Sequence, residues 1–146
     1  MSFLAGFIYR QFIHYPPKPT ASFKGKSIIV TGANVGLGKE AVRYFVQLGA
    51  SQVILACRNI EKGQAAAEEI QLSTRCSPST LAVWKLDMSS YASVKTFAER
   101  ARSELPRLDA LVGNAGISTS TFRITEVSLV NRTVRARTDS NPPPGQ

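Results

Sequence analysis

The sequence has 146 residues, 43% of them hydrophobic, so it is long enough for one domain with a buried core and too apolar for a disordered chain. Its formal net charge is +8, but the lysines and arginines are scattered and form no basic run with interleaved aromatic residues, so we expect no nucleic-acid partner. The two cysteines, Cys57 and Cys76, match neither a zinc nor a redox spacing, which argues against a metal centre and favours a reducing, cytoplasmic location.

Residues 1–23 are expected to form an apolar segment followed by a proline-rich linker. The apolar stretch at 3–13 is interrupted by Arg10 and is shorter than the ~20 residues that a membrane span needs. It also lacks the basic beginning and the cleavage site of a signal peptide. We expect this stretch to pack on the domain surface, with weak peripheral contact to a membrane as the alternative.

Within residues 24–118, short apolar runs that suit buried strands alternate with segments of helical periodicity. The expected strands are 27–31, 52–56, 80–86 and 108–112, and the expected helices are 36–48, 59–73 and 89–105. In the first helix, the expected buried face consists of Leu37, Ala41, Phe45 and Leu48. Asn59 is expected to cap the second helix, and Ser89 or Ser90 the third.

This alternation predicts an α/β fold, a Rossmann-type doubly wound parallel sheet that is incomplete and holds the first four strands in the order 3-2-1-4. Residues 119–146 are rich in serine, threonine, arginine and asparagine and carry only weak hydrophobic periodicity. We expect this divergent tail to be disordered or to lie as a strand along the open edge of the sheet.

A glycine-rich segment at 31–38 joins the first strand to the first helix. Glycine lets a chain turn tightly and lets its backbone approach a pyrophosphate, while the start of the helix offers free N–H groups and a positive dipole end. Gly32 would make the turn, Gly36 would allow close approach, and Gly38 would let helix and strand pack. The expected site residues of this segment are Gly32, Asn34, Gly36, Leu37 and Gly38. We therefore predict a dinucleotide-binding loop.

The pattern Thr-Gly-x-x-x-Gly-x-Gly at 31–38 resembles the cofactor signature of the short-chain dehydrogenase/reductase family. Leu86-Asp87-Met88 after the third strand resembles that family's adenine-contacting pair, and Asn114-Ala115-Gly116 resembles its Asn-Asn-Ala-Gly motif, with Gly113 in place of the first asparagine. The sequence Ala56-Cys57-Arg58-Asn59 is similar to the corresponding segment of the family's retinol-dehydrogenase-like branch. The resemblance covers about the first 124 residues, so the chain is expected to be truncated after the fourth strand.

This resemblance implies roles for the second and third motifs. Asp87 would accept a hydrogen bond from the adenine amine, with Met88 beside it. Asn114 would stabilise the end of the fourth strand and approach the adenosine ribose. Ala115 and Gly116 are small and would let the cofactor lie across the crevice.

The residue after the second strand distinguishes the two nicotinamide cofactors. An acidic residue there holds the ribose 2′-hydroxyl of NAD, whereas an arginine suits the 2′-phosphate of NADP. Position 58 is Arg58, and positions 56, 57 and 59 carry no acid. We therefore predict NADP(H), with Lys62 as an additional contact and an ordinary surface arginine as the alternative.

The resemblance also implies a catalytic tyrosine, lysine and serine beyond the fourth strand. Residues 119–146 contain no tyrosine and no lysine, so no catalytic residue is assigned. Tyr91 and Lys95 have the family's Tyr-x-x-x-Lys spacing, but they precede the fourth strand, and we interpret them as structural.

We therefore expect an NADP(H)-dependent oxidoreductase that acts on an alcohol or carbonyl and is inactive in this truncated form. The main alternative is a non-enzymatic nucleotide-binding fragment, and a nucleic-acid-binding module is supported by charge alone. The resemblance implies a homo-oligomer for full-length members of the family, and it leaves the oligomeric state of this chain open.

Overall fold

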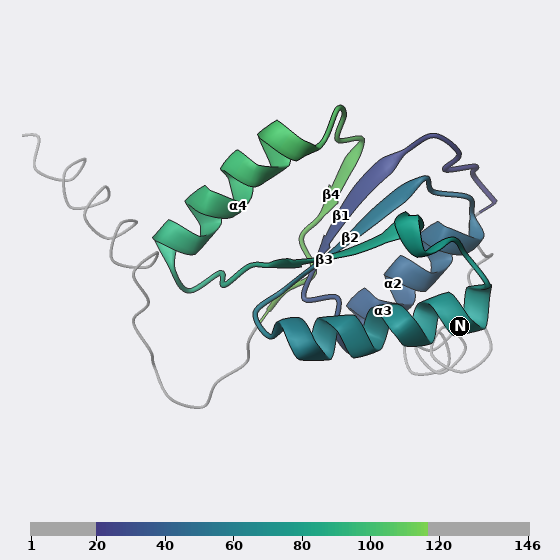
Figure 1. Ribbon diagram of the computed structural model, residues 1–146, viewed down its shortest axis with the longest axis horizontal. Coiled ribbons are helices and arrows are strands. Elements are labelled where there is room, and N and C mark those ends of the chain that lie inside the picture. The colour runs from purple at the N-terminus through teal and green to yellow at the C-terminus, as the bar shows by residue number, and fades with distance from the viewer. Residues whose placement is uncertain (1–19, 117–146) are drawn as a thin grey trace, which may run out of the picture.

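The computed structural model describes residues 20–116, which form a sheet with helices on both faces (Figure 1). The elements in chain order are β1 (Ser27–Thr31), α2 (Gly36–Gln47), β2 (Gln52–Cys57), α3 (Ile60–Thr74), the short 3-10 helix η1 (Pro78–Thr80), β3 (Leu81–Lys85), α4 (Tyr91–Glu104) and β4 (Ala110–Val112). The predicted alternation of strands and helices is thus confirmed.

The four strands are parallel and lie in the order β3-β2-β1-β4, as predicted. Thr31 at the end of β1 is in register with Ala56 on β2, and Val30 is in register with Val112 on β4. Because parallel strands end at the same edge of a sheet, the segments that follow all four strands gather at one edge. The predicted site residues all belong to these segments or to the helices that begin there.

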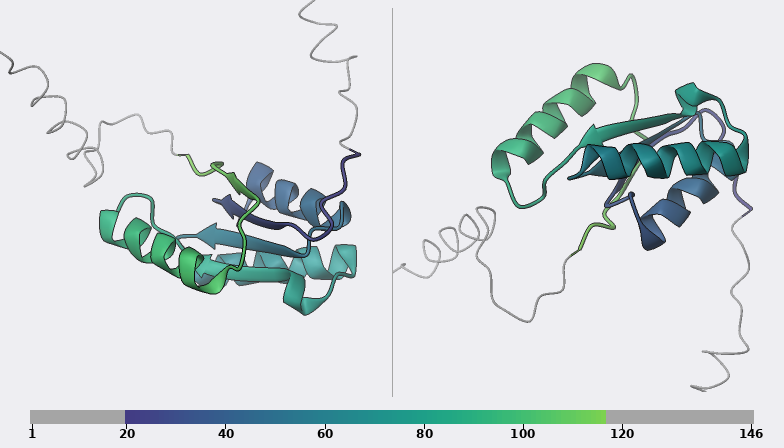
Figure 2. Two further views of the ribbon diagram at one scale, coloured as in Figure 1. Left: turned by 90° about the horizontal axis from the view of Figure 1, so that it is seen from above. Right: turned by 60° about the horizontal axis from the view of Figure 1, so that its bottom comes forward.

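Helices α2 and α3 lie on one face of the sheet and α4 lies on the other (Figure 2). The sheet has a hydrophobic core on each face. Alternate residues of β1 belong to different cores, because successive side chains of a strand point to opposite faces. Ile28 and Val30 join the larger core under α2 and α3, whereas Ile29 joins Trp84 and Leu105 in the smaller core under α4.

The buried face of α2 differs from the prediction. Gly38, Val42 and Val46 are buried, whereas Leu37 is 84% exposed. Gly38 packs against Gly32 O and the Asn114 side chain, where a Cβ would not fit. Because successive residues of an α-helix are rotated by about 100°, Leu37 points away from this contact. The prediction for Leu37 as a core residue was therefore wrong, although Phe45 does pack against the core.

The helix starts follow the predicted capping. The Asn59 side chain accepts a hydrogen bond from Lys62 N at 2.9 Å at the start of α3. Of the two candidates for α4, Ser90 is the N-cap, and its hydroxyl accepts from Ser93 N. Because side-chain oxygens at these positions satisfy orphan N–H groups, both helices begin at defined residues.

β4 is shorter than predicted, because Leu108 and Asp109 lie outside it. Asp109 N donates to Ser27 O at 2.9 Å, but the Asp109 carboxylate takes the place of a backbone acceptor for Ser27 N, also at 2.9 Å. A short aspartate side chain competes in this way with the regular ladder. β3 also loses one residue at each end of the predicted range.

The predictions for the stretch at 3–13, for the proline linker and for most of the divergent tail lie outside the described residues. Within residues 20–116, no helix is long and apolar enough to cross a membrane.

Candidate functional site

The glycine-rich segment lies where the sequence predicted it, at the junction from β1 to α2. Gly32 N donates to Ala56 O at 2.8 Å, so the turn begins against the end of β2. Gly32 and Gly36 adopt left-handed φ angles of 64° and 59°. Side chains with a Cβ are disfavoured in this region, which explains glycine at both positions.

The first turn of α2 carries no cap from a side chain. Val35 occupies the N-cap position in an extended conformation, and the first turn contains no acidic residue. Val35 and Leu37 are 64% and 84% exposed. The N–H groups at this helix start therefore have no side-chain acceptor, and no acidic residue stands in the first turn, which is the arrangement that suits an anionic ligand group.

The other glycines differ in what surrounds them. A Cβ at Gly36 would meet no heavy atom within 4 Å, so the space beside it is open. A Cβ at Gly38 would lie 2.4 Å from Asn114 Nδ2 and 2.6 Å from Gly32 O. Gly38 thus allows the helix to pack against the turn, as the sequence predicted, while Gly36 leaves room for a ligand.

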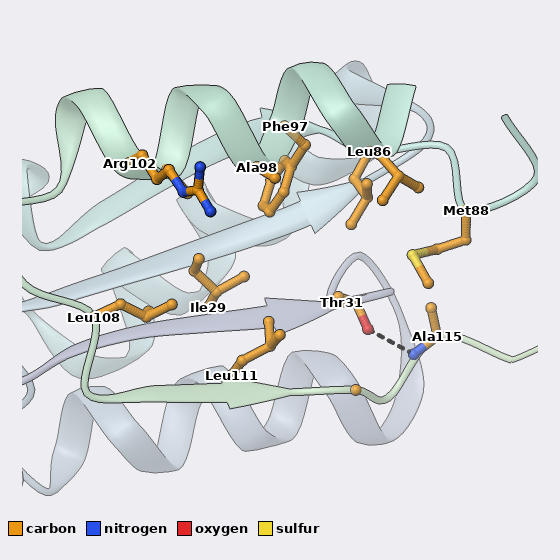
Figure 3. Close-up of a pocket in the computed structure, with 13 residues that line it drawn as sticks. Ile29, Thr31, Leu86, Met88, Phe97, Ala98, Arg102, Leu108, Leu111 and Ala115 are labelled. Atoms are coloured by element: carbon orange, nitrogen blue, oxygen red, sulfur yellow. Dashed lines mark hydrogen bonds between the residues drawn. The ribbon is translucent and has the colours of Figure 1, made fainter. Parts of the chain in front are cut away.

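Thr31 ties the glycine turn to the segment after β4. Its hydroxyl Oγ1 accepts from Ala115 N at 2.9 Å, the hydrogen bond drawn in Figure 3. The same oxygen accepts from Asn114 N at 3.0 Å and donates to Val112 O at 3.3 Å. The Asn114 side chain donates from Nδ2 to Thr31 O and Gly32 O. Asn114 therefore stabilises the end of β4, as predicted, but Thr31 was not among the predicted site residues.

Asp87 follows β3 and turns the chain toward α4. Its Oδ1 accepts from Ser89 N at 2.9 Å and from Ser89 Oγ at 2.6 Å, and these hydrogen bonds, with smaller contributions from Arg58 and Lys85, lower the pKa of the carboxyl. The carboxylate is thus negatively charged at neutral pH. Met88, the next residue, is 53% exposed.

Arg58 and Lys62 are both exposed, at the end of β2 and in the first turn of α3. Among residues 20–116, no ion pair engages either side chain. Arg58 acts electrostatically on Asp87, so the two groups share one region of the site edge. Both cations are therefore available to an anionic ligand near the glycine turn.

A cavity of about 660 Å³ lies between α4 and the β1–β4 part of the sheet (Figure 3). We call it the α4–β4 groove. Its lining residues are Ile29, Thr31, Leu86, Met88, Val94, Phe97, Ala98, Ala101, Arg102, Leu108, Leu111, Gly113 and Ala115. Two predicted site residues, Met88 and Ala115, lie at its end near the carboxyl ends of the strands, whereas Arg58 and Lys62 are not among its lining residues.

The two residues with the family's Tyr-x-x-x-Lys spacing, Tyr91 and Lys95, both lie on α4. Tyr91 is the first residue of α4 and is 59% exposed, and Lys95 Nζ lies 4.0 Å from Glu99 Oε1 on the same helix. In the part of the chain that the structure describes, no cluster of histidine, cysteine, aspartate or glutamate could hold a metal ion.

A sequence profile described as short chain dehydrogenase matches residues 26–137. The chain belongs to the short-chain dehydrogenase family. It is 50% identical over 121 residues to the short chain dehydrogenase/reductase dmxR8 of Cryptosporiopsis sp., and the match covers 83% of this chain and 37% of that relative. This short-chain dehydrogenase chain thus spans less than half the length of the curated relative.

Solved structures of short-chain dehydrogenases have the same fold. A structure described as a short chain dehydrogenase from Escherichia coli CFT073 is 34% identical, with a TM-score of 0.60, and the match covers 70% of this chain and 43% of that one. Another from the same source, complexed with NADPH, is 31% identical, with a TM-score of 0.59, over 68% of this chain and 41% of the other. The short-chain dehydrogenase architecture of β1 to β4 is therefore common to these proteins.

Proposed function

We propose that the described residues bind the adenosine half of NADP(H), as part of an oxidoreductase that transfers hydride between this cofactor and an alcohol or carbonyl. The observation that carries the proposal is the start of α2, where a glycine turn leads to a first turn without a side-chain cap or an acidic residue. Open space beside Gly36 gives a pyrophosphate access to these N–H groups. Asn34 in the turn and Leu37 in the first turn of α2 would flank this approach.

The choice of NADP(H) over NAD(H) rests on Arg58. A guanidinium binds phosphate through two parallel hydrogen bonds, and Arg58 is exposed at the strand end beside the glycine turn. Lys62 adds a second positive charge from the first turn of α3. The NADPH complex of the Escherichia coli relative supports this choice.

The remaining predicted residues would hold the adenine and its ribose. Asp87 accepts hydrogen bonds from Ser89, which lower the pKa of its carboxyl, and it would also accept from the adenine amine. Asn114 keeps the segment after β4 against the glycine turn, so Ala115 and Gly116 can line the crevice without bulk. Met88 would cover one face of the adenine from the end of the groove.

We further propose that the chain binds the cofactor without turning over a substrate. Hydride transfer to a carbonyl needs a proton donor near the carbonyl oxygen. Among residues 20–116, Tyr91 and Lys95 have the spacing of such a pair, but both lie on α4, before β4, and we assign neither to this role. This feature also favours the second candidate function, a nucleotide-binding fragment without catalytic activity.

Calorimetric titration with NADPH and NADH tests the cofactor proposal. We expect NADPH to bind about 10- to 100-fold more tightly, which corresponds to a charge-assisted hydrogen-bond pair of about 1.5–3 kcal/mol. Arg58→Asp should remove this preference and leave NADH binding nearly unchanged. Lys95→Asp makes the same change of net charge on α4 and serves as the control.

Equal losses for the two cofactors in Arg58→Asp would contradict the assignment of the 2′-phosphate to Arg58. Absence of binding of either cofactor would contradict the nucleotide site itself. An assay of NADPH oxidation with a panel of aldehydes and ketones then separates the two functions, because the fragment should bind without turnover.

A further inference from the structure

Asp87 is held by three serines that follow it in the chain, Ser89, Ser90 and Ser93, which we call the serine turn. The carboxylate Oδ1 accepts from Ser89 N at 2.9 Å and from Ser89 Oγ at 2.6 Å. The carbonyl oxygen of Asp87 accepts from Ser90 N at 3.2 Å. The amide N–H of Asp87 donates to Ser93 Oγ at 2.9 Å. The carboxylate, the carbonyl and the amide of one residue therefore each have a partner within the serine turn.

Ser93 makes a contact that helix capping does not require. The N-cap of α4 is Ser90, whose side chain already accepts from Ser93 N. In a capping box, a polar side chain at the third position of a helix returns to the backbone N–H of the N-cap residue. The Ser93 hydroxyl reaches three residues further back, to the amide of Asp87. It therefore ties the first turn of α4 to the residue that we propose meets the adenine.

The chain before Asp87 is fixed to the sheet. Leu86 N donates to Cys57 O at 3.0 Å, and the Leu86 side chain is buried in the core under α4. Phe97 of α4 packs edge-on against Trp84 of β3 in the same core. Asp87 thus stands where the sheet and α4 meet, and the hydrogen bond to Ser93 joins its amide to the helix.

The direction of the Asp87 carboxylate decides which base it can accept. The hydrogen bonds from Ser89, and to a smaller extent the charge of Arg58, lower the pKa of this carboxyl, so it is ionised at neutral pH. An ionised carboxylate is an acceptor only. It accepts from the exocyclic amine of adenine but repels the carbonyl oxygen that hypoxanthine carries at the same ring position. This discrimination requires a fixed carboxylate, and the backbone of Asp87 sets its direction.

We propose that Ser93 is a positioning residue for base selectivity, which holds the amide of Asp87 so that the carboxylate meets the amine of adenine. The inference rests on the proposed function, the binding of NADP(H), and adds to it a residue of α4 that acts through Asp87.

Calorimetric titration with NADPH and with its hypoxanthine analogue tests the inference. We expect the parent chain to bind NADPH about 10-fold more tightly than the analogue, as one hydrogen bond to a charged group provides. In Ser93→Ala this preference should fall below about 2-fold, while the preference for NADPH over NADH stays. Ser93→Thr retains the hydroxyl and should retain both preferences. A purely structural role of Ser93 would not change the ratio between two ligands that differ in one group of the base.

Ser103→Ala is the matched control, because Ser103 is another serine of α4 and its hydroxyl donates to Arg100 O. It should leave both preferences unchanged. Asp87→Asn should lose the preference for adenine as Ser93→Ala does, and the double variant should lose no more than either single variant, because Ser93 acts through Asp87.

Three results would overturn the assignment of Ser93 while leaving NADPH binding intact. They are an unchanged preference for adenine in Ser93→Ala, equal binding of the two bases by the parent chain, and additive losses in the double variant. Absence of NADPH binding by the parent chain would instead contradict the proposed function, and the role of Ser93 would fall with it.

Discussion

The two faces of the sheet are completed to different degrees. Under α2 and α3, both helices contribute buried residues, and Gly38 and Gly63 bring the helices very close to the sheet. Under α4, the core is smaller, and α4 contributes only partly buried side chains, such as Phe97. Residues 20–116 therefore pack the side of the glycine turn closely, while on the groove side they leave Leu108 and Leu111 exposed.

The largest expected effect tests this difference in packing. Ile70 lies on the buried face of α3 and is fully buried, so Ile70→Ala should lower the free energy of unfolding by about 2–5 kcal/mol. Phe97→Ala should lower it by about 1–2 kcal/mol, because the ring is only partly buried and packs edge-on against Trp84. Urea denaturation followed by circular dichroism measures both.

Leu72→Ala, at an 81% exposed position of α3, is the matched control and should change the free energy of unfolding by less than about 0.5 kcal/mol. A loss in Phe97→Ala as large as that in Ile70→Ala would show that the two faces are equally well packed.

The next effect concerns the hydrogen bonds that join Thr31, at the end of β1, to the segment after β4. Thr31→Val keeps the shape of the side chain but removes the acceptor of Asn114 N and Ala115 N, so it should cost about 1–3 kcal/mol of unfolding free energy. Hydrogen exchange at the amides of Asn114 and Ala115 should also be faster in Thr31→Val than in the parent chain. Thr31→Ser retains the hydroxyl and should behave like the parent chain. Unchanged exchange in Thr31→Val would mean that the segment after β4 is held by other contacts.

The smallest effect concerns charges between helices. Lys39 and Arg43 on α2 both pair with Glu69 on α3, whereas the pairs on α4 join residues of that helix alone. The hydrogen bond from Lys39, followed by the interactions with Arg43, lowers the pKa of Glu69. The pairs therefore contribute stability above the ordinary glutamate pKa, and this contribution is lost as the pH falls through the lowered pKa.

The comparison of Glu69→Gln with the parent chain measures this contribution. The difference in unfolding free energy should be largest near neutral pH, disappear in acid and shrink in high salt. A difference that is independent of pH would assign the effect of Glu69 to packing rather than charge.

The sequence predicted the elements whose signals are local. The apolar runs gave the strands, Asn59 marked the start of α3, and the glycine spacing marked the turn into α2. The role of Thr31 was not predicted, because its partners Asn114 and Ala115 lie more than 80 residues away in sequence. The family pattern does hold a signal for it, since a threonine precedes the first glycine.

Two further differences arise from contacts that periodicity does not encode. The buried face of α2 includes Gly38, whose neighbours come from the turn and from Asn114 rather than from the helix itself. The start of β4 is altered by Asp109, whose side chain replaces a backbone acceptor. Both depend on where distant segments meet, which a single sequence leaves open.

The central claim is that residues 20–116 assemble an adenosine site at the junction of β1 and α2. Backbone amide NMR spectra, recorded during titration with ADP-ribose carrying a 2′-phosphate, test it most directly. We expect the amides from Gly32 to Gly38 and that of Arg58 to shift together, while those of Leu108 and Leu111 stay unchanged. Shifts confined to the groove, or no shift at the glycine turn, would contradict the account.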